Sequence, residues 1–164
     1  MSQRKQQGSV AGENGVATIE REFDVRREAL FRMFTDPKEA AKWFGSPEGA
    51  VTLLFEFDAR PGGTIRIQDR HPDGPVYTTT GTVLEVVEPE RIAFRTTMAP
   101  SDGAAPHEAL QTVTLEAVSP RRTRLTVVVK VLSVGAFSGG IESLVEGFRG
   151  GWGETLDKLQ RALH

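Results

Sequence analysis

The sequence contains no cysteine among its 164 residues, which excludes disulfide bonds, thiolate nucleophiles and cysteine-based zinc sites. The same absence fits a reducing compartment, so we expect a cytoplasmic protein. No run of about 18 or more apolar residues occurs, and we expect no contact with a membrane. Neither sign of charge is in large excess, because the chain has 20 lysines and arginines and 22 aspartates and glutamates. The net charge of -2 argues against a nucleic-acid partner, which requires a basic excess.

Residue patterns for catalysis, phosphate binding and metal binding are few as well. The chain lacks a G-x-S-x-G elbow, a Walker pattern and a G-x-G-x-x-G loop. A metal site would combine His71 with Asp69 and Asp73, although one histidine among carboxylates is more often only a polar turn. His107 flanks a polar loop, where general acid–base chemistry is conceivable and plain exposure is more common. We therefore predict no catalytic residue, no metal and no cofactor.

The composition describes one globular domain, with 38% hydrophobic and 26% charged residues. A chain of this length buries about 69% of its extended surface on folding, enough for one core and too little for two. Residues 1–15 are polar and lack the apolar segment of a secretion signal. We therefore expect a flexible N-terminal tail over residues 1–15 and a single domain over residues 16–164.

The first part of the domain predicts one strand followed by two short helices. Apolar and polar residues alternate over residues 17–25, a period of two that is typical of a half-buried strand. Apolar residues then follow at helical spacing over residues 25–34. A second helix is expected to begin at Asp36 and Pro37, where the aspartate caps free N–H groups and proline suits the first helical position. Gly45, after Trp43 and Phe44, is a plausible end of this helix.

Five or six further strands are predicted between residues 51 and 131. Each segment alternates, and turns such as RPGG at 60–63 and HPDG at 71–74 separate them. Sequential strands with short turns favour an antiparallel meander. A polar loop is expected over residues 99–107. The inward face of the strand over residues 76–87 stays open, because both of its faces carry apolar residues.

The C-terminal part predicts a long amphipathic helix, since apolar residues step by threes and fours from Ile141 to Leu163. Four glycines, at positions 147, 150, 151 and 153, lie inside it. Each should cost roughly 0.5–1 kcal/mol relative to alanine. Close packing of the helix backbone on the sheet, or a kink, is the more common explanation. The alternative is that missing side chains leave an open volume, or let the helix move, beside a cavity.

These elements together predict the fold class. Each strand shows one apolar face, and only the long helix can cover the sheet that they form. We therefore predict an α+β fold in which a curved antiparallel sheet of about six or seven strands wraps around a long C-terminal helix, with two short helices after the first strand. A sheet of this shape can leave a cavity between itself and the helix.

Six motifs in a fixed order carry a resemblance to a known family: I-x-R-x-F at 19–23, F-T-D-P at 34–37, W-F-G at 43–45, D-A-R-P-G-G at 58–63, P-E-R-I at 89–92 and G-W-x-x-x-L at 151–156. The chain resembles the helix-grip fold of the START-like (SRPBCC) superfamily. Within it, the chain is similar to bacterial proteins of the activator-of-heat-shock-protein ATPase (C-terminal-domain-like) family. The resemblance spans nearly the whole chain, from about residue 17 to residue 163.

The resemblance implies a cavity between the sheet and the C-terminal helix, suited to apolar or amphipathic small molecules, and no universal catalytic residue. Val25 and Arg26 stand where family members often carry Ala-Pro, a difference that we expect to be structural only. The additional N-terminal domain of the eukaryotic co-chaperones has no counterpart here. Chaperone activation therefore does not follow from the family's name.

Arg21 is the charged residue that breaks the alternation of the first strand. It stands on the side where Ile19 and Phe23 are expected to face inward. A buried guanidinium needs an acidic or carbonyl partner. That partner is either a group of the protein itself, in a buried or rim salt bridge, or the carboxylate or carbonyl of a ligand. The salt bridge is the more common case.

Aromatic side chains predict the wall of the cavity, although core packing explains most aromatic residues at such spacing. Tyr77 would add a hydroxyl and Trp152 an indole N–H. Pockets of this kind are mainly apolar with a few placed polar groups. The candidate ligand-binding residues are therefore Arg21, Trp43, Phe44, Phe57, Ile67, Tyr77, Phe94, Phe148 and Trp152.

Three functions stay open. The first is binding of a small hydrophobic or amphipathic molecule in the cavity. The second is a protein-interaction module of the heat-shock ATPase activator type, linked to the stress response, with an exposed apolar patch and a filled interior. The third is a polyketide cyclase-like or hydrolase-like enzyme that uses the same cavity through Arg21, Tyr77 or His107. A chaperone partner has no support in any residue, and the chain is expected as a monomer or a homodimer.

Overall fold

Seven alternating segments form one antiparallel sheet in the computed structural model, which describes residues 15–100, 105–135 and 139–163. The strands are β1 Val16–Phe23, β2 Val51–Phe57, β3 Thr64–Arg70, β4 Val76–Val87, β5 Arg91–Pro100, β6 His107–Ser119 and β7 Arg122–Ser133. The helices are α1 Arg27–Thr35, α2 Pro37–Ala40 and α3 Gly140–Ala162. The flexible tail predicted over residues 1–15 lies almost entirely outside the described residues.

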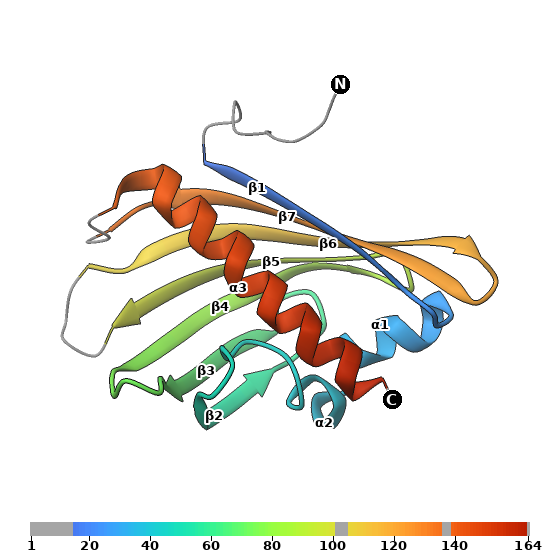
Figure 1. Cartoon of the computed structure of the whole chain (residues 1–164), viewed down its shortest axis with the longest axis horizontal. Helices are drawn as coiled ribbons and strands as arrows, with labels where there is room; N and C mark the ends of the chain where they lie inside the picture. Colours follow the sequence, from blue (N-terminus) through green and yellow to red (C-terminus); the bar gives the residue numbers. More distant parts are fainter. Residues whose placement is uncertain (1–14, 101–104, 136–138, 164) are drawn as a thin grey trace.

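The strand order is β1-β7-β6-β5-β4-β3-β2, so β2 to β7 form a continuous meander and β1 joins its far edge beside β7. All neighbouring pairs are antiparallel. The sheet curves around α3, which crosses its concave side diagonally (Figure 1). The predicted α+β helix-grip fold is confirmed, with seven strands and two short helices after the first one.

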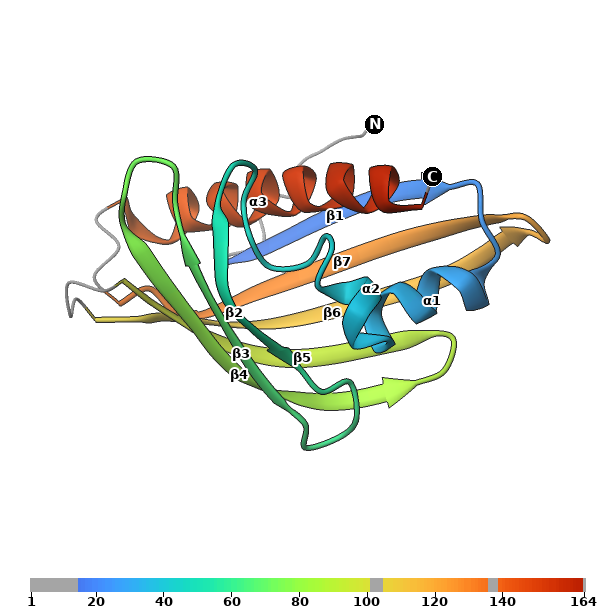
Figure 2. The same ribbon diagram turned by 90° about the horizontal axis from the view of Figure 1, so that it is seen from below.

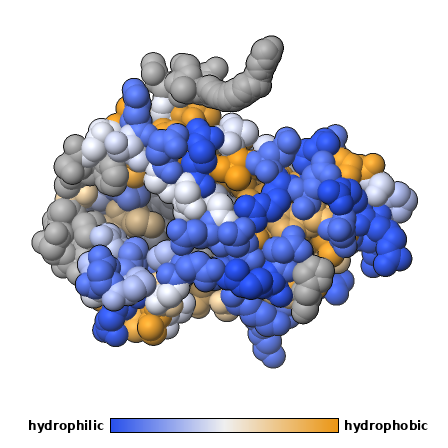
Figure 3. All heavy atoms as spheres, viewed as in Figure 1, coloured by the Kyte–Doolittle hydropathy of each residue, from blue (hydrophilic) through white to orange (hydrophobic). Residues whose placement is uncertain are grey.

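Helix α3 covers the concave face with one apolar stripe. Figure 2 shows α3 on one side of the curved sheet, with α1 and α2 beneath its C-terminal half. Hydrophilic residues gather along its outward face (Figure 3). The helix packs on β1 and β7, at one margin of the sheet. Its buried residues are Leu144, Val145, Trp152, Thr155, Leu156 and Leu159. Among the described residues, no helix is both long and apolar enough to cross a membrane.

A proline and a tryptophan fix the path of the chain after α1. The carbonyl of Met33 would normally accept a hydrogen bond from the residue four positions on, but that residue is Pro37, which has no N–H. The indole Nε1 of Trp43 donates to this carbonyl instead, at 3.0 Å. Trp43 is fully buried, and its ring meets Phe34 edge-on at 4.7 Å between centroids. The motifs F-T-D-P and W-F-G are therefore linked, because the tryptophan of the second donates the hydrogen bond that the proline of the first cannot.

The second helix begins as predicted and ends earlier. Asp36 caps it, because its Oδ1 accepts a hydrogen bond from the backbone N–H of Lys38 at 3.0 Å. The prediction that the helix extends to Phe44 is wrong, since α2 ends at Ala40 and a turn follows. The indole of Trp43 in this turn reaches back to α1, where it bonds to the carbonyl of Met33. Gly45 then adopts φ +92°, a left-handed conformation that favours glycine.

The ambiguity of the strand over residues 76–87 has a local cause. The pairing of β4 with β5 shifts between Val83 and Glu85, which is the signature of a β-bulge. Val83 is fully buried and Leu84 is 48% exposed. Val86, three residues after Val83, packs against the core again. One inserted residue therefore exchanges the two faces of the strand, and this explains why both carry apolar residues.

The polar loop predicted over residues 99–107 is shorter in the structure. Strand β5 runs to Pro100 and β6 begins at His107. The stretch 101–104 lies outside the described residues.

We predict that Trp43→Phe lowers the free energy of unfolding by about 2–4 kcal/mol. The change leaves the buried carbonyl of Met33 without its donor and removes part of a fully buried ring. Urea denaturation followed by circular dichroism measures the difference. Phe55→Leu, on a partly buried ring elsewhere, is the control for loss of aromatic area. A loss below about 1 kcal/mol for Trp43→Phe would contradict this role.

Candidate functional site

A cavity of about 300 Å³ lies between the sheet and α3. It is bounded by β3, β4, β5 and β6, by α3, and by the turn that follows α2. Its volume is at the lower end for small-molecule pockets. The apolar part of its wall consists of Phe44, Ile65, Ile67, Phe94, Met98, Leu144, Phe148 and Trp152.

Two glycines of α3 keep one side of this cavity free of side chains. Gly147 and Gly151 both line it, and they are four residues apart, so they share one face of the helix. A Cβ atom added at either position would meet no atom within 4 Å. The helix is continuous from Gly140 to Ala162. Close packing of the helix backbone on the sheet therefore does not explain these two glycines, which face open space beside the cavity.

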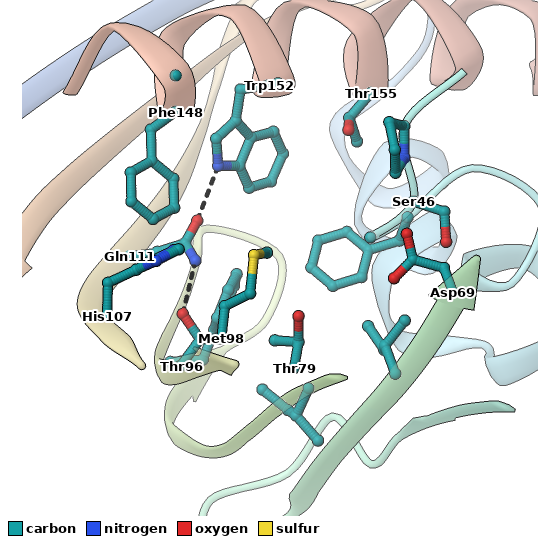
Figure 4. Close-up of a pocket in the computed structure, with 18 of the residues that line it drawn as sticks. Ser46, Asp69, Thr79, Thr96, Met98, His107, Gln111, Phe148, Trp152 and Thr155 are labelled. Atoms are coloured by element: carbon teal, nitrogen blue, oxygen red, sulfur yellow. Dashed lines mark hydrogen bonds between the residues drawn. The ribbon is translucent and has the colours of Figure 1, made fainter. Parts of the chain in front are cut away.

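One end of the cavity carries a hydrogen-bonded chain of three side chains (Figure 4). The indole Nε1 of Trp152 donates to Gln111 Oε1 at 2.7 Å. Gln111 Nε2 then donates to Thr96 Oγ1 at 2.9 Å. All three residues are buried. The amide of Gln111 is thereby engaged at both its oxygen and its nitrogen, and the chain fixes the indole plane as a wall.

His107 stands next to this chain, at the start of β6. Its ring meets Phe148 of α3 edge-on, with 5.7 Å between centroids. Burial lowers the pKa of the His107 imidazole below its ordinary value. The neutral ring is therefore the form that suits this position.

The opposite end of the cavity contains a buried carboxylate. Asp69 occupies an inward position of β3, two residues after Ile67, and is 3% exposed. The hydroxyls of Ser46 and Thr155 lie on the same side of the cavity (Figure 4). Burial raises the pKa of Asp69, and the proximity of His71 and Lys158 lowers it by less.

The neighbours of Asp69 are a histidine and a lysine. His71 Nε2 lies 3.1 Å from Asp69 Oδ2, and its ring rests against Tyr77 with 4.3 Å between centroids. Lys158 of α3 donates from Nζ to the backbone carbonyl of Ser46 at 2.7 Å. Burial lowers the pKa of Lys158 as well.

The structure brings five of the nine predicted site residues together in the cavity wall: Phe44, Ile67, Phe94, Phe148 and Trp152. Three others lie outside the wall. Trp43 and Phe57 belong to the buried core, where Phe57 packs against Phe44 at 5.0 Å between ring centroids. Tyr77 supports His71, which itself lines the cavity.

Arg21, the fourth residue outside the wall, lies at the margin between β1 and α3. Its Nη1 forms a 2.6 Å ion pair with Asp157 Oδ1, and its side chain is 33% exposed. Nη2 is 3.5 Å from the carbonyl of Gly153. Of the two predicted partners, a protein group or a ligand, the structure shows the first, in a salt bridge at the rim. The structure therefore gives Arg21 a protein carboxylate as its partner.

Asp69 and Gln111 are two buried polar wall residues that are absent from the predicted site. Both stand at inward positions of strands whose other inward residues are apolar, Ile65 and Ile67 in β3 and Val113 in β6. A polar residue in phase with buried ones was the available signal. Among the described residues, no cluster of three or more possible metal ligands occurs, so His71 and its two neighbouring aspartates do not form one.

A curved antiparallel sheet that encloses an apolar cavity with its C-terminal helix defines a protein of the helix-grip class. The sequence matches the family described as Activator of Hsp90 ATPase homolog 1-like protein over residues 24–164, and the chain belongs to this family. The family predicted from the six motifs is thus confirmed.

Solved structures of bacterial proteins share the fold over nearly their whole length. A protein from Chromobacterium violaceum is 29% identical, with a TM-score of 0.72, 90% of this chain and 95% of that chain being covered. The AHSA1 protein from Silicibacter pomeroyi is 25% identical, with a TM-score of 0.74 and coverage of 90% and 96%. A Rhizobium loti protein is 26% identical, with a TM-score of 0.71 and coverage of 90% and 95%. No curated protein matches at a significant level.

We predict that protonation of His107 destabilises the fold. Because burial lowers its folded-state pKa, the unfolded chain takes up this proton first, near its ordinary pKa of about 6.5. The stability that the neutral ring contributes is therefore present above about pH 6.5 and is lost as the pH falls through the lowered folded-state value. Urea denaturation between about pH 7.5 and pH 5 should show the native chain losing more stability than His107→Gln. Parallel pH profiles for the two proteins would contradict this.

Proposed function

We propose that this protein binds a small apolar or amphipathic molecule in the cavity between the sheet and α3. The observation that carries the proposal is that the long helix presents two glycines, Gly147 and Gly151, to an apolar cavity of about 300 Å³. Two glycines in a helix interior cost roughly 1–2 kcal/mol relative to alanine. Alanine would fit at both positions without a contact within 4 Å. A helix selected only for stability would carry it there.

The wall of the cavity is fixed in advance of binding. Trp152 is held by Gln111 at 2.7 Å, and Phe44 packs against Phe57, Phe94 and Trp152 with ring centroids 5.0–5.9 Å apart. Side chains that are already ordered lose little conformational entropy when a ligand arrives, which favours binding. A rigid apolar wall therefore supports recognition of a small molecule by shape.

The alternatives have less support in the described residues. A protein-interaction module of the heat-shock ATPase activator type was expected to have a filled interior, whereas this interior holds a cavity. Exposed apolar residues do occur on the edge strand β2, at Val51, Leu53 and Leu54. For an enzyme, Arg21 has a partner outside the cavity and Tyr77 lies outside its wall, which leaves His107. Binding therefore accounts best for the arrangement.

We predict that Gly151→Leu weakens the binding of an uncharged naphthalene probe by about tenfold or more, whereas Gly150→Leu does not. Both glycines meet open space, but only Gly151 lines the cavity. Both substitutions improve helix propensity by similar amounts, so neither variant should lose stability. Titration of the probe by fluorescence measures affinity, and thermal unfolding checks the fold. Gly150→Leu is the matched control, because Gly150 is one position away and does not line the cavity.

Saturable one-to-one binding that only Gly151→Leu weakens would support the proposal. Equal affinities of the native chain and both variants would place the probe elsewhere on the surface and overturn it. Absence of probe binding by a well-folded, ligand-free sample would also overturn it. The apolar residues of β2 would then be the surface to examine for a protein partner.

A further inference from the structure

The polar end of the cavity contains a buried carboxylate whose ion-pair partner, among the described residues, is His71. The inward positions of β3 are Ile65, Ile67 and Asp69, so a charged residue continues a row of buried apolar ones. Asp69 is 3% exposed and lines the cavity. An apolar residue at this position would have completed the core. The aspartate therefore needs a reason other than packing.

One oxygen of this carboxylate has no hydrogen bond. Asp69 Oδ2 is buried, and within the described parts of the chain it has no hydrogen-bond partner. His71 Nε2 lies 3.1 Å from it and offsets part of its negative charge. Buried polar groups are hydrogen-bonded in the great majority of cases, and leaving one unpaired is costly. Because Asp69 lines the cavity, a donor group that enters the cavity can meet its carboxylate.

The lysine whose charge acts on Asp69 donates its hydrogen bond to another group. Lys158 gives a hydrogen bond to the backbone carbonyl of Ser46 at 2.7 Å. In residues 15–100, 105–135 and 139–163, no lysine or arginine forms an ion pair with Asp69. Lys158 and His71 both reduce the cost of the negative charge from a short distance. The site is therefore a carboxylate with partial charge compensation and a free acceptor atom.

The two ends of the cavity differ in this respect. At the other end, Gln111 accepts from Trp152 and donates to Thr96, so that its amide is engaged on both sides. Figure 4 shows this chain on one side of the cavity and Asp69, with Ser46 and Thr155 near it, on the other. At the Asp69 end, a ligand group that donates a hydrogen bond meets a buried carboxylate that lines the cavity.

We propose that Asp69 is the polar anchor of the cavity and accepts a hydrogen bond from a hydroxyl or amino group on an otherwise apolar ligand. This inference rests on the proposed function, because it assigns the ligand class of the same cavity. The ligand is a small alcohol, phenol or amine with an apolar body that packs against Phe94, Phe148 and Trp152. A carboxylic acid of the same shape is excluded, since its charge would meet that of Asp69 in an apolar surrounding.

The test uses four probes that share one apolar body: methylnaphthalene, naphthylmethanol, naphthylmethylamine and naphthoate. Calorimetric titration into the full chain near neutral pH measures each affinity. The native protein should bind the alcohol and the amine about tenfold more tightly than methylnaphthalene, as expected for one hydrogen bond to a charged acceptor. Naphthoate should bind more weakly than methylnaphthalene. Comparing the affinities of the alcohol and the amine shows whether Asp69 prefers a neutral or a cationic donor.

Two substitutions at the anchor and one control complete the design. Asp69→Asn keeps the shape and removes the charge, so the preference for the amine should disappear while part of the preference for the alcohol remains. Asp69→Leu removes the acceptor, so both preferences should disappear and methylnaphthalene should bind at least as tightly as before. Asp73→Asn removes an exposed carboxylate outside the cavity and should change none of the four affinities.

The outcomes separate this inference from the proposed function. Binding of all four probes with equal affinity would overturn the anchor and leave the cavity function standing. Tighter binding of naphthoate than of the alcohol would overturn the anchor as well. Binding of none of the probes would overturn both. Preferences that survive in Asp69→Leu would show that another group makes the contact, and the assignment to Asp69 would be wrong.

Discussion

The width of one helix is the constraint on which this structure depends. An α-helix with its side chains is about 10–12 Å across, whereas seven strands at a spacing of about 4.8 Å form a sheet about 29 Å across. The sheet therefore curves around α3, and α1 and α2 close the side that the helix does not reach (Figure 2). Because α3 packs on β1 and β7, the cavity is left in front of β3, β4 and β5.

Polar contacts hold α3 at both margins of the cavity. Toward β1, Arg21 pairs with Asp157, and on the other side Lys158 and Glu154 bond to the backbone of Ser46 and Glu48. Exposed pairs of this kind contribute little stability each, about 0–1 kcal/mol. The apolar stripe of the helix supplies most of the stabilisation. The polar contacts favour one rotation of the helix about its axis, and that rotation presents its two open glycine positions to the cavity.

Sequence periodicity predicts the type of each element and which of its residues face inward. It predicts less well the environment that neighbouring elements give to a single residue. The strands, the long helix and five wall residues such as Phe94 and Trp152 follow from alternation and helical spacing. For Arg21 the sequence predicts an acidic or carbonyl partner, from the protein or a ligand, and the structure gives it Asp157. Its place at the helix margin follows from β1 being an edge strand, which alternation does not reveal. Asp69 was assigned to a turn, since the apolar row of β3 stops at Ile67. The bulge between Val83 and Glu85 exchanges the two faces of β4, so alternation does not predict its inward face.

A cavity that is apolar all round would hold a ligand in many orientations with similar energy. This one has a saturated polar chain at Gln111 and an acceptor without a hydrogen bond at Asp69. In the proposed complex Asp69 accepts a hydrogen bond from the entering donor, and this contact gives the bound molecule a direction. The apolar wall then contributes affinity in proportion to the area it covers, while Asp69 contributes selectivity. In the free protein His71 and Lys158 offset part of the desolvation of this carboxylate among buried isoleucines, and a donor on the proposed ligand would offset more of it.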